Sequence, residues 1–414
     1  MNKRKLINDP VYGLIHIRTP LLFDLIEHPL FQRLRRIKQT GLTHLVYPGA
    51  QHTRFHHALG AMHLMGMAID ELMSKQTDIT PREEEAALIA VLLHDIGHSP
   101  YSHALEGLLV QADHESIGKL LISHLQKTLD DGIGLALEMF EGLYHRPFFH
   151  QLISGQLDLD RLDYLSRDSF YTGVAEGVVG HDRILRMLQV VDDQLVVEEK
   201  GLHSIEKFLV ARRIMYWQVY LHKTVLSAEL MAKHIISLLR EEESSTRSPF
   251  IAAELEYFFS NKVDLEHFKK DFDEILPFFL ALDDISIDYS IKRLTKYPSS
   301  QSLAFLTSNL VNRKLHKIQW SPEPIDDNVV QGMVRKTAVQ HNWSEEVAEK
   351  LVWTGSESNS IYNREIDEIQ ILTKDEEIKP FSSFLETPIS IALNRKYFIC
   401  YPGKSKSANP AGKG

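Results

Sequence analysis

Leu92-Leu93-His94-Asp95-Ile96-Gly97-His98 joins the end of an apolar segment to a pair of ionisable residues, and the rest of the chain is arranged around it. The segment 86–93 offers no polar face to water. It follows Thr80-Pro81-Arg82-Glu83, which is typical of a capping box with proline at the first helical position. A helix that is apolar on all sides is buried, so its polar end needs a specific partner. We therefore expect a buried helix that ends at a polar corner formed by His94 and Asp95.

The ionisable pair itself has two interpretations. His94 and Asp95 can hydrogen-bond each other or cap a neighbouring segment, as an isolated His-Asp dipeptide usually does. Alternatively, they are adjacent ligands of one divalent metal ion, because imidazole and carboxylate together suit a borderline-hard cation. The pair alone leaves both open. The choice depends on whether the chain supplies further ligands elsewhere.

Length, charge and cysteine content limit the class of protein. A chain of 414 residues is long enough for one large domain with a smaller one appended. The formal net charge of -10 lacks the basic field of a nonspecific nucleic-acid binder, so nucleic acid is not expected as a partner. The single cysteine, Cys400, excludes an internal disulfide framework, and the first residues lack the apolar core of a signal peptide. No apolar run approaches the roughly 20 residues that span a bilayer, so we expect a cytoplasmic protein without membrane association.

Hydrophobic periodicity divides the chain into two unequal parts and a tail. Residues 1–240 are dominated by helical patterns, after an extended run at 14–17 and a helix that opens at Thr19-Pro20. Residues 241–402 mix helices and strands, which predicts a smaller α+β lobe, and residues 403–414 are low in apolar side chains and predict a disordered tail. The fold class is therefore mainly α. The expected later elements are helices at 204 to about 240, 268–282 and 344–354, and strands at 368–372 and 397–401.

Several histidines accompany the opening stretch. His57 stands four residues before Ala61 in a helical pattern, so it faces inward, either as a packing residue or as a ligand. His98, His103 and His114 follow the His-Asp pair closely in the sequence, and Asp113-His114-Glu115 starts another amphipathic helix. Histidine enrichment can simply mark a surface, yet bystander histidines beside a buried corner are costly to desolvate.

The segment 156–168 is the next dense group of charges. Asp160, Tyr164 and Asp168 stand at i, i+4 and i+8 on one helical face. One interpretation is an ordinary surface helix in which Asp163 and Arg167 pair at i,i+4. The other is that a carboxylate near the helix start projects at a metal ion, and the segment alone leaves both open.

Two stretches carry basic residues in a pattern. In the helix predicted from 204, two cations and two aromatic residues line one side and suit a nucleotide, through phosphate pairing and base stacking. These residues are Arg212, Tyr216, Tyr220 and Lys223. The segment 30–39 is basic on one face and apolar on the other. A solvated amphipathic face remains the alternative for both stretches.

Taken in order, His57, the His94-Asp95 pair and Asp160 form an H…HD…D pattern. This pattern resembles the HD-domain superfamily of metal-dependent phosphohydrolases, and the flanking residues are similar to its deoxynucleoside triphosphate triphosphohydrolase branch. The resemblance covers roughly residues 1–240 and implies a mainly α fold with an HD-domain helical core. The flanking matches are KLINDP from Lys5, FQRLR from Phe31, YPGA from Tyr47 and YLHK from Tyr220.

The resemblance assigns roles residue by residue. It implies one divalent ion per subunit, among Mn, Mg, Fe, Zn, Co and Ni, held by His57, His94, Asp95 and Asp160. His114, with Glu115 beside it, matches the proton-transferring histidine of the family, and His98 and His103 match residues beside the α-phosphate. Phosphate-binding cations match at Arg54, Arg212 and Lys223. Residues around the sugar 3′-hydroxyl match at Gln39, Tyr164 and Asp168, and Tyr220 lies where the base would sit.

The resemblance also implies regulation. In related triphosphohydrolases a second nucleotide pocket forms between the subunits of a homotetramer. The matching positions here are Lys5, Asn8, Gln32 and Arg35, with Glu27 where the relative carries aspartate. We therefore expect a nucleotide substrate, a nucleotide activator and a homo-oligomer, either a tetramer or a dimer.

The reaction implied by the resemblance is attack of water on the α-phosphorus of a deoxynucleoside triphosphate (dNTP), as in dGTPases, which releases deoxynucleoside and intact triphosphate. Two departures from the family pattern, Ser99 for glycine and Arg161 for lysine, bear on substrate preference. One alternative is an HD phosphohydrolase that acts on a cyclic nucleotide, a guanosine tetraphosphate or a monophosphate. Another is a nucleotide sensor without turnover.

Overall fold

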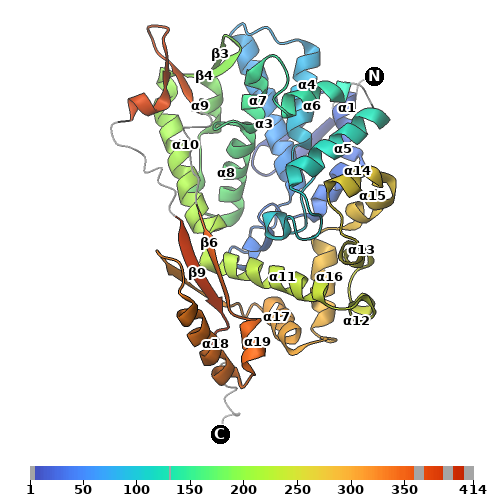
Figure 1. Ribbon diagram of the computed structural model, residues 1–414. Coiled ribbons are helices and arrows are strands. Elements are labelled where there is room, and N and C mark those ends of the chain that lie inside the picture. Colours follow the sequence, from blue (N-terminus) through green and yellow to red (C-terminus); the bar gives the residue numbers. More distant parts are fainter. Residues whose placement is uncertain (1–4, 130–131, 359–367, 386–394, 405–414) are drawn as a thin grey trace, which may run out of the picture.

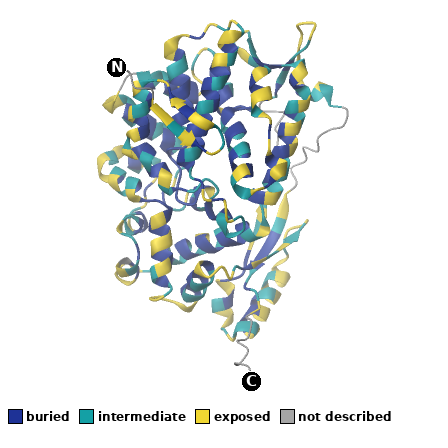
Figure 2. Cartoon of the chain, turned by 180° about the vertical axis from the view of Figure 1, so that it is seen from behind, coloured by how far each residue is buried: buried dark blue, intermediate teal, exposed yellow. Residues whose placement is uncertain are grey.

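The computed structural model describes residues 5–129, 132–358, 368–385 and 395–404. Most of the tail predicted at 403–414 lies outside these residues. The expected mainly α fold is confirmed, with helices gathered around one centre and small sheets at the periphery (Figure 1). Buried residues concentrate on the inward faces of the helices (Figure 2).

Three helices form the centre and position the histidine corner. They are α3 (Arg54–Ser74), α4 (Pro81–Leu93) and α8 (Leu159–Thr172), and α3 packs against both of the others. The predicted capping box is confirmed, because the Thr80 hydroxyl accepts from the Glu83 amide at 3.2 Å and the Glu83 carboxylate accepts from the Thr80 amide at 2.8 Å. Every residue from 86 to 93 is buried, as expected for a helix without a polar face.

The remaining elements of the first 200 residues surround this centre. They are β1 (Lys5–Asp9), β2 (Gly13–Ile17), α1 (Pro20–Glu27), α2 (Pro29–Gln32), α5 (His114–Thr128), α6 (Gly132–Phe140), α7 (Pro147–Ser154), α9 (His181–Arg186), β3 (Leu188–Val191) and β4 (Gln194–Glu198). The strands β1 and β2 form an antiparallel hairpin. Thr19 caps α1 and Asp113 caps α5 through side-chain oxygens, which confirms both predicted helix starts.

The single long helix predicted from 204 to about 240 is wrong. The chain forms α10 (Leu202–Met215), a π-helical turn (Tyr216–Tyr220) and a separate helix α11 (Lys223–Glu241). The break occurs because His222 is extended, with a ψ of 123°, and its ring accepts from the Thr224 amide as the cap of the new helix. As a result α11 lies crosswise to α10 (Figure 1).

Two shorter predictions also need correction. The segment 268–282 is split into α14 (Leu265–Lys270) and α15 (Phe272–Ala281), because Asp271 leaves helical geometry. The segment 344–354 is only a short helix, α19 (Glu345–Glu349), and its end belongs to strand β6 (Trp353–Glu357), which pairs with a later strand.

The rest of the chain adds helices and two sheets. The helices are α12 (Ser244–Arg247), α13 (Ala253–Ser260), α16 (Asp284–Leu294), α17 (Gln301–Val311) and α18 (Asp327–His341), and the strands are β5 (Lys317–Ser321), β7 (Gln370–Leu372), β8 (Ile378–Pro380) and β9 (Lys396–Tyr401). The two late strands expected from the sequence, β7 and β9, are confirmed. The sheet orders are β3-β4-β7-β8 and β5-β9-β6. Because β7 pairs with β4, a segment from the last 50 residues lies against a strand from the first 200. The division of the chain at residue 240 stays a prediction.

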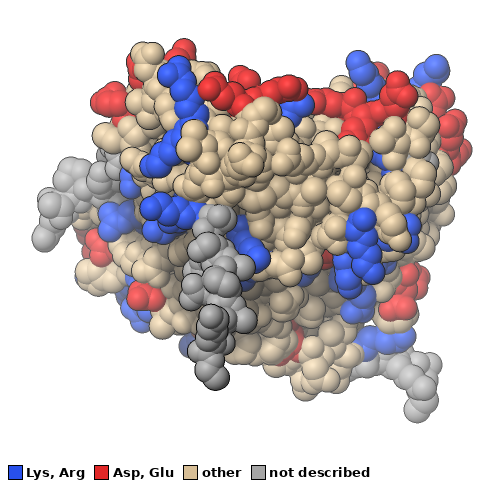
Figure 3. Space-filling view, turned by 90° about the horizontal axis from the view of Figure 1, so that it is seen from below, with Lys and Arg blue, Asp and Glu red and all other residues tan. Residues whose placement is uncertain are grey.

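The surface seen from below is mixed in charge. Lysine and arginine side chains lie in separate groups, aspartate and glutamate form a band along one edge, and uncharged side chains lie between them (Figure 3). Within the residues described, no helix is both long and apolar enough to cross a membrane.

Candidate functional site

A cleft of about 550 Å³ lies between the central helices and the turn that joins α10 to α11. Many of the residues expected at a site line it. They are Gln39, Arg54, His94, Asp95, His98, His103, His114, Glu115, Asp160, Tyr164, Asp168 and Tyr220. The cleft therefore gathers side chains from α3, α4, α5, α8 and the turn after α10.

A group of three possible metal ligands lies at the wall of the cleft. Nε2 of His57 lies 3.0 Å from Oδ1 of Asp160 and 3.3 Å from Nε2 of His94. The ligand atoms of the three residues all lie within 4.8 Å of one another. Two imidazoles and a carboxylate that converge from three separate helices form a donor set suited to one divalent cation.

The opposite ring nitrogens are held by other groups, which orients the two imidazoles. Nδ1 of His57 donates to the buried carboxylate of Asp163 at 2.7 Å, and Nδ1 of His94 donates to the carbonyl oxygen of Val91 at 2.6 Å. Because Nδ1 of each ring is engaged in this way, Nε2 is the nitrogen left to bind a metal ion in place of a proton. Of the two interpretations of the His94-Asp95 pair, a metal site therefore fits this arrangement better than a simple His-Asp hydrogen bond.

The electrostatics also favour a cation. Burial alone lowers the pKa of His57, but hydrogen bonds and charges from Asp160 and Asp163 outweigh it and raise the pKa to about 10. Although burial opposes it, the same imidazole contacts lower the pKa of Asp160 well below its usual value. The group therefore carries a negative potential that holds positive charge.

Asp95 lies beside this group but has other partners. Its oxygens lie 3.3 Å from Nε2 of His94 and 3.6 Å from Nε2 of His57. Oδ2 accepts from Nη1 of Arg54 at 2.5 Å, and Oδ1 lies 3.0 Å from Nε2 of His98. Asp95 as a fourth ligand stays a prediction.

The sequence interpretation missed Asp163 as part of the site. Asp163 and Arg167 do pair at i,i+4, with two contacts of 2.9 Å, but both are fully buried rather than on a surface helix. Arg167 also donates to Asp9 at 2.7 Å, so the network ties α8 to the N-terminal hairpin. The i,i+4 spacing was enough to predict the Asp163–Arg167 pair. The burial of the pair depends on the packing of α3 against α8.

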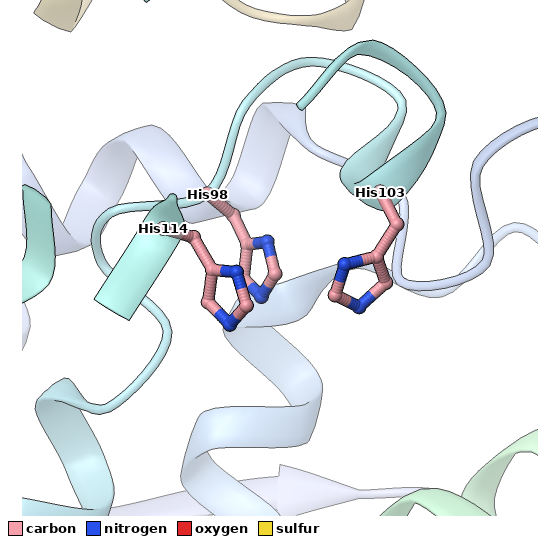
Figure 4. Close-up of side chains that lie close together, drawn as sticks. All are labelled: His98, His103 and His114. Atoms are coloured by element: carbon pink, nitrogen blue, oxygen red, sulfur yellow. The ribbon is translucent and has the colours of Figure 1, made fainter. Parts of the chain in front are cut away.

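Three histidines form a second group at the cleft. The rings of His98 and His114 stack with centroids 3.9 Å apart, and the ring of His103 turns toward them from the neighbouring loop (Figure 4). The sequence interpretation missed Glu106, which lies 2.5 Å from Nδ1 of His114 and 2.9 Å from Nδ1 of His103. Burial raises the pKa of Glu106, but these hydrogen bonds outweigh it and hold the pKa well below its usual value. Glu106, rather than Glu115, is the carboxylate that orients His114.

The side of the cleft formed by α8 is tied to the turn after α10. Asp168 accepts from the Tyr220 hydroxyl at 2.6 Å, and its other oxygen lies 2.6 Å from Nε2 of His52. Tyr164 and Tyr220 face each other edge to face with centroids 6.0 Å apart. The i, i+4, i+8 face predicted from Asp160 to Asp168 therefore forms one continuous wall.

Two predicted phosphate cations are not among the residues that line the cleft. Arg212 is buried and donates to Gln156 at 3.4 Å. Lys223 is exposed at the first turn of α11. The break between α10 and α11 separates the two cations, because Arg212 lies within α10 and Lys223 begins α11. Lys233, which was not singled out from the sequence, lines the cleft.

The residues expected at a regulatory pocket lie at the surface of the N-terminal part. Arg35 donates to Gln32 at 2.8 Å and lies over the ring of Phe55, while Lys5 lies over the ring of Phe23. Asn8 and Glu27 are exposed. The alternative interpretation, a solvated basic face at 30–39, does not hold for one arginine of this segment.

That residue is Arg33, which is fully buried in a 3₁₀ turn (Arg33–Arg36). It turns inward because buried carbonyl groups accept its protons. Nη1 donates to the His98 carbonyl at 2.8 Å, and Nε donates to the Leu282 carbonyl at 3.0 Å. Arg33 thus ties the basic segment to the loop that carries His98.

Comparison with known proteins agrees with this geometry. A family model described as HD domain matches residues 54–168, and one described as HD associated region matches residues 179–254. The chain is similar to a phosphohydrolase of Bacteroides thetaiotaomicron, with 43% identity, a TM-score of 0.90 and coverage of 96% of this chain and 100% of that one.

Curated relatives point the same way. YwfO of Bacillus subtilis is 36% identical over 294 residues, which cover 69% of this chain and 67% of that protein. The deoxynucleoside triphosphate triphosphohydrolase SAMHD1 homolog of Dictyostelium discoideum is 34% identical over 249 residues, which cover 55% of this chain and 48% of that protein. The match thus spans about half of the latter relative. From the site and these similarities, the chain belongs to the HD-domain family of metal-dependent phosphohydrolases.

Proposed function

We propose that the protein hydrolyses dNTPs to deoxynucleoside and inorganic triphosphate, with one divalent ion per subunit. The observation that carries the proposal is the arrangement at a single cleft: His94 and Asp160, which form a metal-type group with the buried His57 behind them, stand beside a histidine trio and an aromatic wall. Similarity to the Dictyostelium discoideum relative, which is named as a dNTP triphosphohydrolase, supports the choice of substrate.

The histidine trio supplies the proton chemistry. Glu106 keeps Nδ1 of His114 protonated, so Nε2 of the ring is the atom that exchanges a proton with the reacting phosphate or water. His98, His103 and Arg54 lie beside it and stabilise the charge that develops on the phosphate oxygens. A divalent cation bound by His57, His94 and Asp160 would supply Lewis-acid polarisation of a phosphate oxygen.

The aromatic wall orients the nucleoside. The Asp168 carboxylate is fixed by His52 and Tyr220, so it is preorganised to accept from a sugar hydroxyl. Gln39 faces the same cleft, and Tyr164 and Tyr220 supply flat surfaces for the sugar and base. A close fit of Tyr164 at C2′ would exclude ribonucleotides, whose additional hydroxyl needs space there.

Regulation by a second nucleotide belongs to the same proposal. Lys5 and Arg35 can pair with a triphosphate, and Glu27 can accept from a guanine edge. Their exposure in a single chain is compatible with a pocket completed by another subunit of a homotetramer or dimer. A nucleotide bound there would stabilise the oligomer and, by linkage, the active arrangement of the cleft.

One assay tests the reaction. Purified protein is incubated with each dNTP and each of several divalent metals, and the products are separated for triphosphate and pyrophosphate. We expect deoxynucleoside and triphosphate. Release of pyrophosphate, or turnover of a cyclic nucleotide or guanosine tetraphosphate in place of dNTPs, would overturn the proposal.

Two variants test whether hydrolysis depends on the metal site. Asp160→Ala is expected to lose both bound metal and hydrolysis, while Glu241→Gln, on an exposed residue at the end of α11, should change neither. A variant that lost its metal yet kept full activity would contradict the assignment of the site. Metal content is measured by atomic emission on the same samples.

A further inference from the structure

One end of the cleft carries charges that the reaction does not use. Glu229 and Lys233 stand one turn apart on α11, and Glu357 stands at the end of β6; all three line the cleft. They are neither in the metal-type group nor in the histidine trio. Tyr216 and Tyr220 line the same cleft from the turn before α11, so the charges share it with the aromatic wall.

The three groups act on one another through their charges, and Lys233 is exposed. Among the residues that the structure describes, no hydrogen bond or ion pair engages the side chains of Glu229, Lys233 or Glu357. Burial and the neighbouring charge of Glu357 raise the pKa of Glu229 to about 8, although Lys233 opposes the shift. Leaving a carboxyl group half-buried and unpaired costs free energy, which a bound ligand can recover.

The adjacent loop adds two more unpaired polar atoms. Oε1 of Gln39 and Oγ1 of Thr40 are buried and have no hydrogen-bond partner among the residues that the structure describes. Both residues line the cleft, and the loop continues to Gly41, where an added Cβ would lie 3.7 Å from the Glu229 carboxylate. Unsatisfied atoms therefore surround one end of the cavity from α11, β6 and this loop, as expected of a recognition site for a polar ligand.

The hydrogen-bond donors and acceptors of Glu229, Lys233 and Glu357 suit some nucleobases better than others. In their ionised form the two carboxylates accept hydrogen bonds, and the ammonium group donates them; two donors on the base edge would favour the ionised form of Glu229. Guanine offers two adjacent donors, N1–H and the 2-amino group, and one acceptor, O6. Cytosine and thymine offer two acceptors and one donor, and adenine lacks the carbonyl group. The arrangement on α11 and β6 thus complements guanine best.

We propose that Glu229, Lys233 and Glu357 are specificity-determining residues that bind the base edge of the nucleotide and favour guanine. The Lys233 ammonium donates to O6, and the two glutamates accept from N1–H and the 2-amino group. This inference rests on the proposed function for the placement of the triphosphate. The identity of the base is tested separately from the chemistry.

The experiment compares kcat/KM for dGTP, dATP, dCTP, dTTP and dITP, which lacks the 2-amino group. We expect dGTP to exceed the other natural substrates by roughly tenfold or more, since a hydrogen bond to a charged group contributes at least this much. Lys233→Met should remove most of that preference by lowering kcat/KM for dGTP more than kcat/KM for dATP. Glu229→Gln should reduce the discrimination between dGTP and dITP, while Glu241→Gln on the same helix should not.

Equal kcat/KM for the four natural substrates, or an equal loss for all of them in both variants, would overturn the base assignment while leaving the proposed function intact. If no dNTP yields triphosphate, the proposed function fails, and equilibrium dialysis with deoxyguanosine and deoxyadenosine then decides the inference. Preferential binding of deoxyguanosine that is lost in Lys233→Met supports it. Equal binding of both, or binding of neither, refutes it.

Discussion

Asp163→Asn tests how the fold prepares His57 for a metal ion. The Asp163 carboxylate accepts from Nδ1 of His57 on one side and from Arg167 on the other. An asparagine has nearly the same shape, but only one of its two terminal atoms accepts. If its oxygen faces Arg167, its amino group faces His57 and forces the proton of the ring onto Nε2, where it blocks metal binding.

The magnitude follows from that geometry. Losing a group that orients a ligating histidine typically lowers metal affinity by about 10-fold to 100-fold, which corresponds to about 1.4 to 2.7 kcal/mol. Folding stability also falls, because a buried ion pair loses one charge, by up to about 3 to 5 kcal/mol. Arg167 keeps its contact with Asp9 at 2.7 Å, which limits this second loss.

Metal affinity is measured by titration against a chelator of known affinity, and stability by thermal unfolding of the metal-free protein. Asp9→Asn is the matched control. It removes the other carboxylate that pairs with Arg167, and it leaves the His57–Asp163 hydrogen bond in place. We expect both variants to melt at lower temperature and only Asp163→Asn to lose metal affinity. An affinity within twofold of the parent in Asp163→Asn, or an equal loss in the control, would refute the reasoning.

Three further predictions concern other parts of the molecule. His114→Ala should retain its metal and lose turnover by roughly 10²-fold, the usual range for a proton-transfer group; loss of metal on elemental analysis would make it a ligand. Gly60→Ala should unfold at clearly lower temperature and bind metal weakly, because the added Cβ would lie 1.9 Å from the Asp163 carboxylate. Gly332→Ala, where the added Cβ would meet no other described part of the chain within 4 Å beyond its own helix backbone, should be neutral or stabilising in the same melt, and equal melting of the two would contradict the clash. Arg35→Ala should abolish activation of one dNTP's hydrolysis by another and spare the unstimulated rate; hyperbolic kinetics with every nucleotide mixture, from a protein that sediments as a monomer, would count against the regulatory pocket.

Local chemistry was enough to predict the helices that carry the site. The capping box at Thr80, the apolar run to Leu93 and the caps at Thr19 and Asp113 act within one or two turns, so they are legible in the sequence. The inward position of His57 followed from helical periodicity in the same way. These features bring the expected side chains to a common corner because each lies at or near a helix terminus or on a buried face.

Contacts between distant segments were decided only in the tertiary structure. Asp163 and Arg167 became a buried network because α3 and the N-terminal hairpin close over them, and Arg33 turned inward because the carbonyl groups of His98 and Leu282 accept its protons. Neither fact has a local signature, since periodicity records which face of a helix is apolar and not what packs against it.

The break between α10 and α11 shows the same limit most clearly. The residues at this break continue a helical pattern, so the sequence predicted that Arg212 and Lys223 lie on the same side of one long helix. The π-helical turn and the His222 cap redirect the chain, so that Lys223 is exposed at the start of α11 while Lys233 lines the cleft. A side chain's position along a helix is a local property, whereas its place in a cleft depends on the direction of the whole helix, which long-range packing sets.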